Sequence, residues 1–208
     1  MNLVKKVYSK EQREICLFDN FGTGKTVLVI GVVHGEEPQG KGLIDNYIVR
    51  SNKNRLLIIP CLNPDGYYKG ERQNSNGVDL NRNFPTKNWI LSEKNQYFGG
   101  NVPASEIETK FVLDVFEKYK PDLILTIHAP YKVVNYDGPA KDYAEVISKI
   151  IGYETSCDIG YPTPGSMGNY FGVERDIPII TLELDEEVSI EDLQGKFNCI
   201  MDYFANEF

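Results

Sequence analysis

The chain has 208 residues, of which 41% are hydrophobic and 25% charged, a composition typical of a globular protein large enough to bury its own core. No apolar run approaches the roughly 20 residues that a membrane-spanning helix requires, so we expect no membrane span. The net charge of −8, without a long cluster of Lys and Arg, argues against nucleic acid as a partner. We expect one domain that covers residues 1–208.

The amino-terminal segment MNLVKKVYSKEQREI is basic and then polar, and it lacks the apolar stretch of a secretory signal, which predicts a cytoplasmic protein. The cysteines are far apart and form no CxxC pair, so we expect reduced thiols and no cysteine metal site. The four cysteines are Cys16, Cys61, Cys157 and Cys199.

The next segment, GTGKT at 22–26, resembles the end of a phosphate-binding P-loop. A P-loop would need glycine where Asp19 stands, and it would follow a strand, whereas this segment precedes one. We interpret GTGKT as a turn.

Four apolar, β-branched runs are typical of buried strands, and helical patterns alternate with them. The predicted strands are TVLVIGVV (26–33), RLLIIPCL (55–62), DLILTI (122–127) and IPIITLEL (177–184). The predicted helices are 40–50, 105–119, 139–151 and one that begins at Ser189. This alternation predicts a single-domain α/β fold with three layers, α/β/α, around a central mixed, largely parallel sheet.

Two of the predicted helices carry further signals. Ser105 and Glu108 have the spacing of a capping box, and Pro121 ends the same helix. The last helix has one apolar face, which predicts ordinary core packing, and its residues are Ile190, Leu193, Phe197, Ile200 and Phe204.

The interval 63–100 is rich in Asn, Gly and Pro and contains no convincing helix or strand. A connection of this length is uncommon in a compact domain unless it is functional. We expect a functional loop here.

The chain has only two histidines, and each directly follows a predicted buried strand. His34 ends TVLVIGVVH, His128 ends DLILTIH, and a third strand ends at Glu183. Either histidine alone would be interpreted as a hydrogen-bonded core residue. Because ligands of α/β sheets gather at the carboxyl ends of strands, we expect the three side chains to converge.

Catalytic zinc commonly takes two imidazoles and one carboxylate. His34, Glu37 and His128 supply this set, and Pro38 suits a tight turn between the first two ligands and a following helix. The spacing favours Glu37 as the carboxylate ligand, and Glu36 stays an alternative. A second alternative is that these acidic residues only stabilise the start of a helix and bind no metal.

Five segments between residues 34 and 183 resemble, in order, the zinc carboxypeptidase family of metallopeptidases. The segments are HGEE, NPDGYYKGERQNSNGVDLNRNFP, SEIET, TIH and TLELDEE. HAPYKVVNYDGPA and GYPTPGSMGNY further resemble the murein tripeptide amidases of that family, which cut the bond between γ-D-glutamate and diaminopimelate. The resemblance implies a zinc carboxypeptidase fold and one zinc ion held by His34, Glu37 and His128.

The resemblance also implies roles for further residues. Asp79 would hold the His34 ring in its metal-binding tautomer, and Glu183 would be the general base toward the attacking water. Arg72 would polarise the scissile carbonyl. Asn81 and Arg82 would grip a substrate carboxylate, and Tyr161 would close over the substrate.

We therefore predict a zinc-dependent peptidase or amidase that acts on small peptides derived from the cell wall. One alternative is a deacylase of N-acyl amino acids, similar to aspartoacylase and succinylglutamate desuccinylase, whose relatives share HGxE and a DLNR segment. Another is a peptide-binding module that has the fold without catalysis, which the complete set of predicted ligands, base and arginine argues against.

Overall fold

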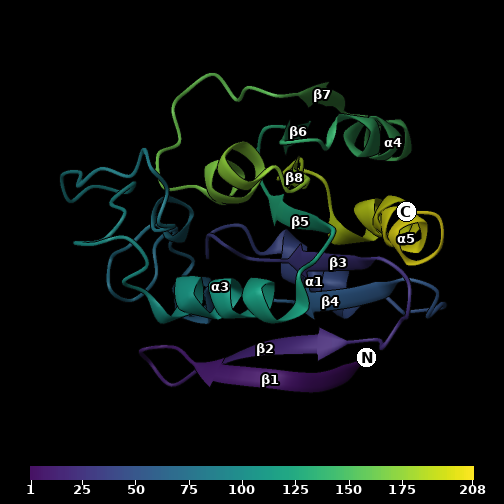
Figure 1. The fold of residues 1–208 in the computed structure, drawn as a ribbon, viewed down its shortest axis with the longest axis horizontal. Coiled ribbons are helices and arrows are strands. Elements are labelled where there is room, and N and C mark those ends of the chain that lie inside the picture. The colour runs from purple at the N-terminus through teal and green to yellow at the C-terminus, as the bar shows by residue number, and fades with distance from the viewer.

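An eight-stranded sheet organises the structure, a computed structural model that describes residues 1–208. The strand order is β1-β2-β4-β3-β5-β8-β6-β7, and the strands follow one another from the bottom to the top of Figure 1. In chain order the strands are β1 (Asn2–Tyr8), β2 (Glu14–Asp19), β3 (Thr26–Ile30), β4 (Arg55–Ile59), β5 (Leu123–His128), β6 (Val133–Asp137), β7 (Glu154–Ser156) and β8 (Ile179–Glu183).

The four central strands, β4, β3, β5 and β8, are parallel to one another. Antiparallel pairs flank them, with β2 against β4 and β1 against β2 on one side and β6 against β8 on the other. Edge strand β7 is parallel to β6. The prediction of a mixed, largely parallel sheet is confirmed.

All four predicted strands are present, with shifted ends. β3 ends at Ile30, before Gly31, and β4 ends at Ile59, before Pro60, which has no N–H for a ladder. β5 continues to His128, one residue beyond the prediction, and β8 begins two residues later than predicted. The flanking strands β1, β2, β6 and β7 are missing from the prediction because they are partly exposed or only three residues long, so they lack a continuous apolar run.

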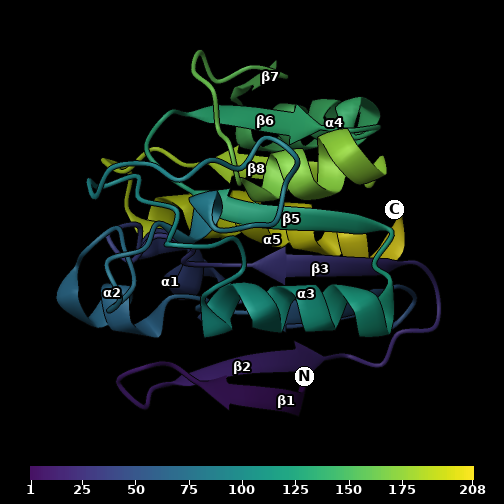
Figure 2. The same cartoon turned by 60° about the vertical axis from the view of Figure 1, so that its left-hand side comes forward.

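Helices cover both faces of the sheet, which confirms the three-layer arrangement. They are α1 (Gln39–Asp45), α2 (Pro64–Lys69), the 3₁₀ helix η1 (Leu80–Arg82), α3 (Ile107–Tyr119), α4 (Lys141–Ile151), the π-helical turn η2 (Gly168–Val173) and α5 (Ile190–Asn206). Figure 2 shows α3 in front of the sheet and α5 behind it. None of these helices is both long enough and apolar enough to cross a membrane.

The helix ends differ from the predictions in three places. α1 stops at Asp45, and α4 begins at Lys141. α3 begins at Ile107 with Glu106 as N-cap and has no side-chain cap, so the predicted capping box of Ser105 is wrong. The Ser105 hydroxyl instead donates to Glu106 Oε1 at 2.6 Å, which takes it away from the helix backbone. α5 begins as predicted, because the Ser189 hydroxyl caps it and accepts from the N–H of Asp192 at 3.2 Å.

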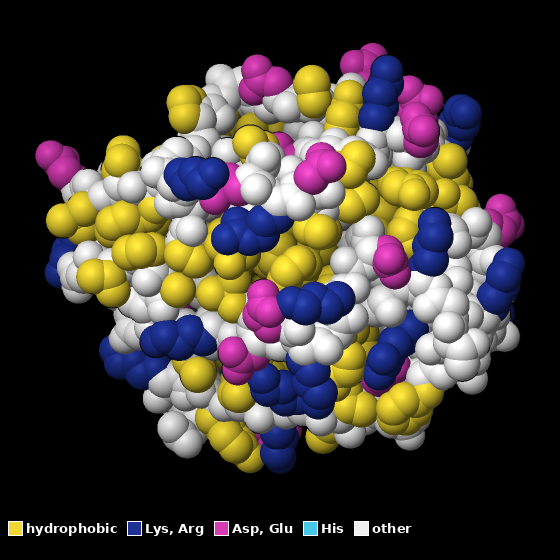
Figure 3. Space-filling view, in the orientation of Figure 1, with side chains coloured by type: hydrophobic (Ala, Val, Ile, Leu, Met, Phe, Trp, Pro, Cys, Tyr) yellow, Lys and Arg dark blue, Asp and Glu magenta, His cyan; other side chains and the backbone are white.

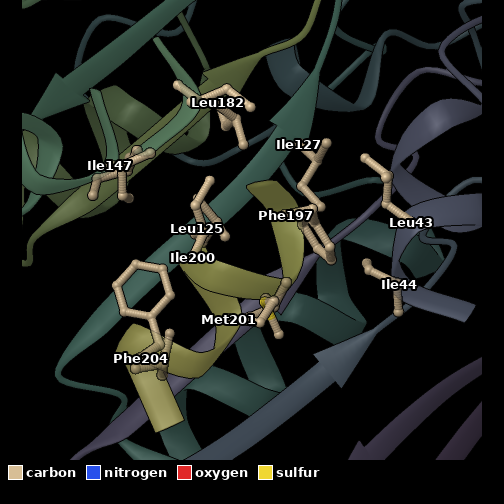
Figure 4. Packing of buried hydrophobic residues seen from close by; sticks show 14 of the residues in the cluster. Leu43, Ile44, Leu125, Ile127, Ile147, Leu182, Phe197, Ile200, Met201 and Phe204 are labelled. Atoms are coloured by element: carbon tan, nitrogen blue, oxygen red, sulfur yellow. The ribbon is translucent and has the colours of Figure 1, made fainter. Parts of the chain in front are cut away.

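Two hydrophobic clusters form the core between the sheet and the helices that cover it. Alternate residues of each central strand enter opposite clusters, as the period of a strand requires; Val29 joins the cluster under α1, α4 and α5, and Leu28 joins the cluster under α3 and η2. The predicted apolar face of α5 is confirmed for Leu193, Phe197, Ile200 and Phe204. Figure 4 shows three of them beside side chains of β5, β8 and α1.

The connection from residue 63 to residue 100 contains two short helices, which corrects the prediction of none. Asn63 caps α2 by accepting the N–H of Gly66 at 2.9 Å, and Gly70 ends it with φ of 67°. η1 follows at the DLNR segment. The GTGKT segment bends before β3 and is tied to the chain at Lys53, so it is no P-loop.

Candidate active site

Neighbouring parallel strands bring the predicted site residues together. His128 and Glu183 are the last residues of β5 and β8 and face each other in the sheet register. His34 lies four residues beyond the end of β3, the other neighbour of β5. The carboxyl ends of these three strands meet at one edge of the sheet, so the three side chains converge as their positions at the strand ends predict.

His34, Glu37 and His128 form one buried cluster whose ligand atoms all lie within 4.8 Å of one another. Glu37 Oε1 lies 2.8 Å from His34 Nδ1, and Glu37 Oε2 lies 2.9 Å from His128 Nδ1. The two Nδ1 atoms are 3.3 Å apart. Both histidines are only 3% exposed, and none is visible on the face in Figure 3. Glu36 lies outside the cluster with its side chain 49% exposed, so the structure brings in Glu37 and not its neighbour.

The charges around His34 favour a cation at this place. Burial alone would lower the pKa of His34, but the Glu37 and Asp79 carboxylates outweigh it and raise that pKa to about 9. Burial likewise opposes ionisation of Glu37 and Asp79. His34 and His128 nevertheless hold the pKa of Glu37 well below its usual range, and His34, Arg72 and Arg82 do the same for Asp79. The cluster thus holds ionised carboxylates in a buried position beside the two imidazoles.

The donors of this cluster fit a divalent metal ion. Two imidazole nitrogens and one carboxylate are the set that catalytic zinc takes, and here they face one point. Asp79 Oδ1 lies 3.1 Å from His34 Nε2, the ring nitrogen that points away from the cluster. Such an acceptor fixes the tautomer that leaves Nδ1 free as a ligand.

Glu183 lies beside the cluster without contributing to it. Its side chain is buried, with 6% exposed, and its Oε2 has no hydrogen-bond partner. Burial is the main cause that raises the pKa of this carboxyl. A buried acceptor without a partner is costly unless a ligand or water meets it, so this oxygen is available to a molecule in the pocket.

Arg72 lies against both Asp79 and the cluster. Its Nε and Nη2 donate to Asp79 Oδ2 at 3.0 and 2.9 Å. Its Nη1 lies 3.9 Å from Glu37 Oε1. Asp79 therefore orients both His34 and Arg72, and Arg72 Nη1 lies 3.3 Å from His34 Nδ1 at the wall of the pocket.

Asn81 and Arg82 follow Asp79 in η1 and line the same pocket. Asn81 Oδ1 accepts the N–H of Met167 at 2.9 Å, so its NH₂ group is the part left for a ligand. Arg82 is 7% exposed and makes no ion pair; Nη1 donates to the Asn81 carbonyl at 2.7 Å. Tyr161 also borders the pocket, 40% exposed, with its ring centre 6.5 Å from that of Tyr131.

The pocket has a volume of about 210 Å³ and extends from the cluster over the sheet face, where it includes residues that the motifs did not identify. Asn135 and Asp137 of β6 line it, as does Thr181 of β8, which pairs with Asn135. The Asn135 Oδ1 is buried without a partner, and no donor of the chain contacts the Asp137 carboxylate, whose pKa burial raises. The NYDGP motif contains both residues, but their position depends on the pairing of β6 with β8.

The chain was compared with known proteins. A profile of the family described as zinc carboxypeptidase matches residues 8–194. Murein peptide amidase A of Vibrio campbellii is 32% identical over 174 residues, which cover 76% of this chain and 68% of that protein. Murein peptide amidase A of Escherichia coli (strain K12) is 28% identical over 157 residues. That match covers 69% of this chain and 64% of the relative, so the chain spans less than two thirds of the relative's length.

Solved structures show the same fold. The murein-tripeptide amidase from Escherichia coli O157 superposes with a TM-score of 0.82 at 23% identity, over 95% of this chain and 89% of that one. Carboxypeptidase A from Helicoverpa armigera superposes with a TM-score of 0.74 at 19% identity, over 96% of this chain and 66% of that one. The fold, the convergence of strand ends and the match over most of its length show that this chain belongs to the zinc carboxypeptidase family.

Proposed function

We propose that this chain is a zinc-dependent amidase that hydrolyses the bond between γ-D-glutamate and diaminopimelate in small murein peptides. Its membership in the zinc carboxypeptidase family and its similarity to murein peptide amidases support a metal-dependent hydrolysis of amide bonds. The observation that carries the choice of substrate is the free Asp137 carboxylate on the wall of the pocket.

His34, Glu37 and His128 would hold one zinc ion through the atoms that already face one another. Bound there, zinc supplies Lewis-acid activation of water and of the scissile carbonyl. The remaining chemistry belongs to side chains of this chain.

Glu183 acts as the general base in this proposal. Its unpartnered Oε2 takes a proton from the attacking water, and the hydroxyl adds to the carbonyl carbon. Glu183 then passes that proton to the leaving amine as the carbon–nitrogen bond breaks, so one water is consumed and an acid and an amine are released. Arg72, which lines the pocket beside the cluster, stabilises the negative charge that develops on the carbonyl oxygen.

Asn81 and Arg82 hold the carboxylate next to the new amine. Arg82 is a buried cation without an acidic partner, and a substrate carboxylate would supply one. This contact places the scissile bond between the cluster and Glu183.

Asp137 and Asn135 select the side chain of the residue that Arg82 holds. Two acceptors without donors on the wall of the pocket favour an ammonium group and disfavour an apolar side chain, which would leave them unpaired. Diaminopimelate carries such a group at the far end of its side chain. Gly168 packs close to this carboxylate, and any side chain there would clash with it, since a Cβ would lie 2.3 Å from Asp137 Oδ2.

The test is digestion of L-Ala-γ-D-Glu-diaminopimelate and of an ordinary peptide with C-terminal phenylalanine, read by mass spectrometry together with metal analysis. We expect zinc-dependent release of diaminopimelate and little release of phenylalanine. Asp137→Asn should lower kcat/KM for the murein peptide about tenfold or more, mainly through KM, because an ammonium loses its charged partner. Asp158→Asn, which changes an exposed aspartate outside the pocket, is the control. Cleavage of the phenylalanine peptide alone would reject the assigned substrate.

The same preparation should be given a panel of N-acyl amino acids. A deacylase would release the acyl group from these compounds and leave the murein peptide intact, and that result would replace the proposed function.

A further inference from the structure

A second cavity, with a volume of about 490 Å³, adjoins the catalytic pocket. The two cavities share four residues, Arg82, Tyr97, Tyr131 and Tyr161. The remaining wall of the second cavity comes from the connection after η1 and from the segment after Tyr161: Ile90, Ser92, Gly99, Pro162 and Pro164. The two cavities are therefore neighbours, and a molecule that occupies both would pass these four side chains.

Arg82 is the polar group at the junction. Its side chain is more than nine-tenths buried, it has no carboxylate partner in the chain, and it lines both cavities. Only Nη1 makes a hydrogen bond, to the Asn81 carbonyl, and the guanidinium lies 5.9 Å from the centre of the Tyr97 ring. The other guanidinium N–H groups are therefore free to donate. A carboxylate or a peptide carbonyl can meet this cation from either cavity.

The second cavity differs from the first in its chemistry. No acidic residue lines it, whereas four carboxylates line the catalytic pocket, those of Glu36, Glu37, Asp137 and Glu183. Tyrosine rings, prolines and Ile90 form most of its surface. Such a surface suits a small apolar side chain, and Arg82 suits the carboxylate that ends it.

We propose that the second cavity receives one further apolar residue of the substrate, joined to the carboxyl group of the diaminopimelate in the catalytic pocket. The chain then hydrolyses the same γ-D-glutamyl bond in peptides that continue by one residue, with a dipeptide as the leaving amine in place of free diaminopimelate. This inference rests on the proposed function.

The experiment compares L-Ala-γ-D-Glu-diaminopimelate with the same peptide extended by one L- or D-alanine. We expect the zinc-loaded protein to cleave one of the extended peptides at the γ-D-glutamyl bond with kcat/KM within about tenfold of the shorter peptide. Ile90→Trp fills the second cavity from an exposed position. This variant should raise KM for the extended peptide about tenfold or more. It should change KM for the shorter peptide by less than about threefold.

Leu91→Trp is the matched control, because Leu91 is the next residue, equally exposed, and lines neither cavity. Ser92→Phe is a second filling variant, two residues further along the same segment of the wall. Cleavage of the shorter peptide alone overturns the inference and leaves the proposed function standing. Cleavage of the extended peptide with unchanged KM in both filling variants also overturns it, whereas no cleavage of any peptide rejects the proposed function itself.

Discussion

Glu183 and Glu108 are both buried glutamates whose pKa burial raises, yet their surroundings differ. Glu183 lines the pocket beside His34, Glu37 and His128, with one oxygen that has no partner. Glu108 lies at the start of α3, 1% exposed, where Asn74 donates to its Oε2 at 3.3 Å. The first is open to a substrate, and the second is enclosed by the protein.

Replacing Glu183 with glutamine should separate catalysis from metal binding. The amide cannot accept a proton from water, so we expect kcat to fall by about a hundredfold to ten-thousandfold. The zinc content should stay equal to that of the unchanged protein, because Glu183 is outside the ligand cluster. Metal analysis and initial rates on one preparation measure both. Full activity of this variant would remove Glu183 from the mechanism.

Glu108 should make stability depend on pH. Burial is the main cause that raises its pKa to about 7; the Glu106 and Asp65 carboxylates add to it, and a backbone N–H and Asn74 partly offset it. Between about pH 4.5 and 7 the folded chain keeps a proton that the unfolded chain releases, so stability is highest below this range and falls as pH rises through it.

Glu108→Gln should remove that loss. The quantity to compare is the free energy of unfolding in urea of the variant minus that of the unchanged chain. We expect this difference to be about 1–3 kcal/mol larger at pH 8 than at pH 5. Glu117→Gln, which changes an exposed glutamate on the same helix, is the control and should show no such difference. Parallel pH profiles of the Glu108 variant and the unchanged chain would contradict the assignment.

The sequence predicts the location of a site residue well where its position at the end of a strand determines that location. His34, His128 and Glu183 each follow an apolar run, so their convergence could be inferred from the run alone. Asp137 could not be placed in the same way. Its strand is half exposed and enters the pocket only through antiparallel pairing with β8, a long-range contact that no local pattern encodes.

At the scale of elements, the turn that carries His34 packs directly on helix α2. A Cβ at Gly35 would lie 2.0 Å from the carbonyl carbon of Gly66, so only glycine allows this approach. The Gly35 N–H also donates to the Arg72 carbonyl at 3.4 Å. The turn, α2 and the Arg72 segment therefore hold one another in place.

Gly35→Ala should disturb this arrangement. Forcing the two backbones apart should cost about 1–3 kcal/mol in urea unfolding and weaken zinc binding, measured by titration. Gly195→Ala is the control, because Gly195 lies in α5 with nothing near its Cβ position and alanine should stabilise the helix by about 0.5–1 kcal/mol. Unchanged zinc affinity in Gly35→Ala would show that the turn does not depend on this contact.

The same scale explains which elements the sequence predicts. Central strands are apolar on both faces and stand out. In contrast, β1 has no fully buried residue, β2 has a buried residue only at every second position, and both carry charges. Helix α2 is only six residues long, so its capping residue Asn63 and its terminal Gly70 define it more than any apolar period does. Short, capped or half-exposed elements depend on tertiary contacts that the pattern does not contain.

For the whole molecule, zinc should act as a folding ligand. The ligands come from segments 91 residues apart or more and meet only in the folded chain, as the contact of Glu37 with His128 shows. A free zinc concentration about 100 times the dissociation constant should add about 2.7 kcal/mol to the free energy of unfolding. Thermal unfolding with zinc and with chelator measures it. His128→Ala should abolish the difference between the two conditions, and an equal zinc effect in that variant would place the metal elsewhere.

The exposed residues Ile90 and Leu91 lie between the part of the chain that provides His34 and Glu37 and the part that provides His128 and Glu183. A break in the backbone there divides the prospective ligands between two polypeptides, 1–91 and 92–208. These two polypeptides would have to associate through the pairing of β3 with β5. Zinc then becomes a bridge between separate molecules, and co-expressed halves should reassociate more tightly with the ion than with chelator.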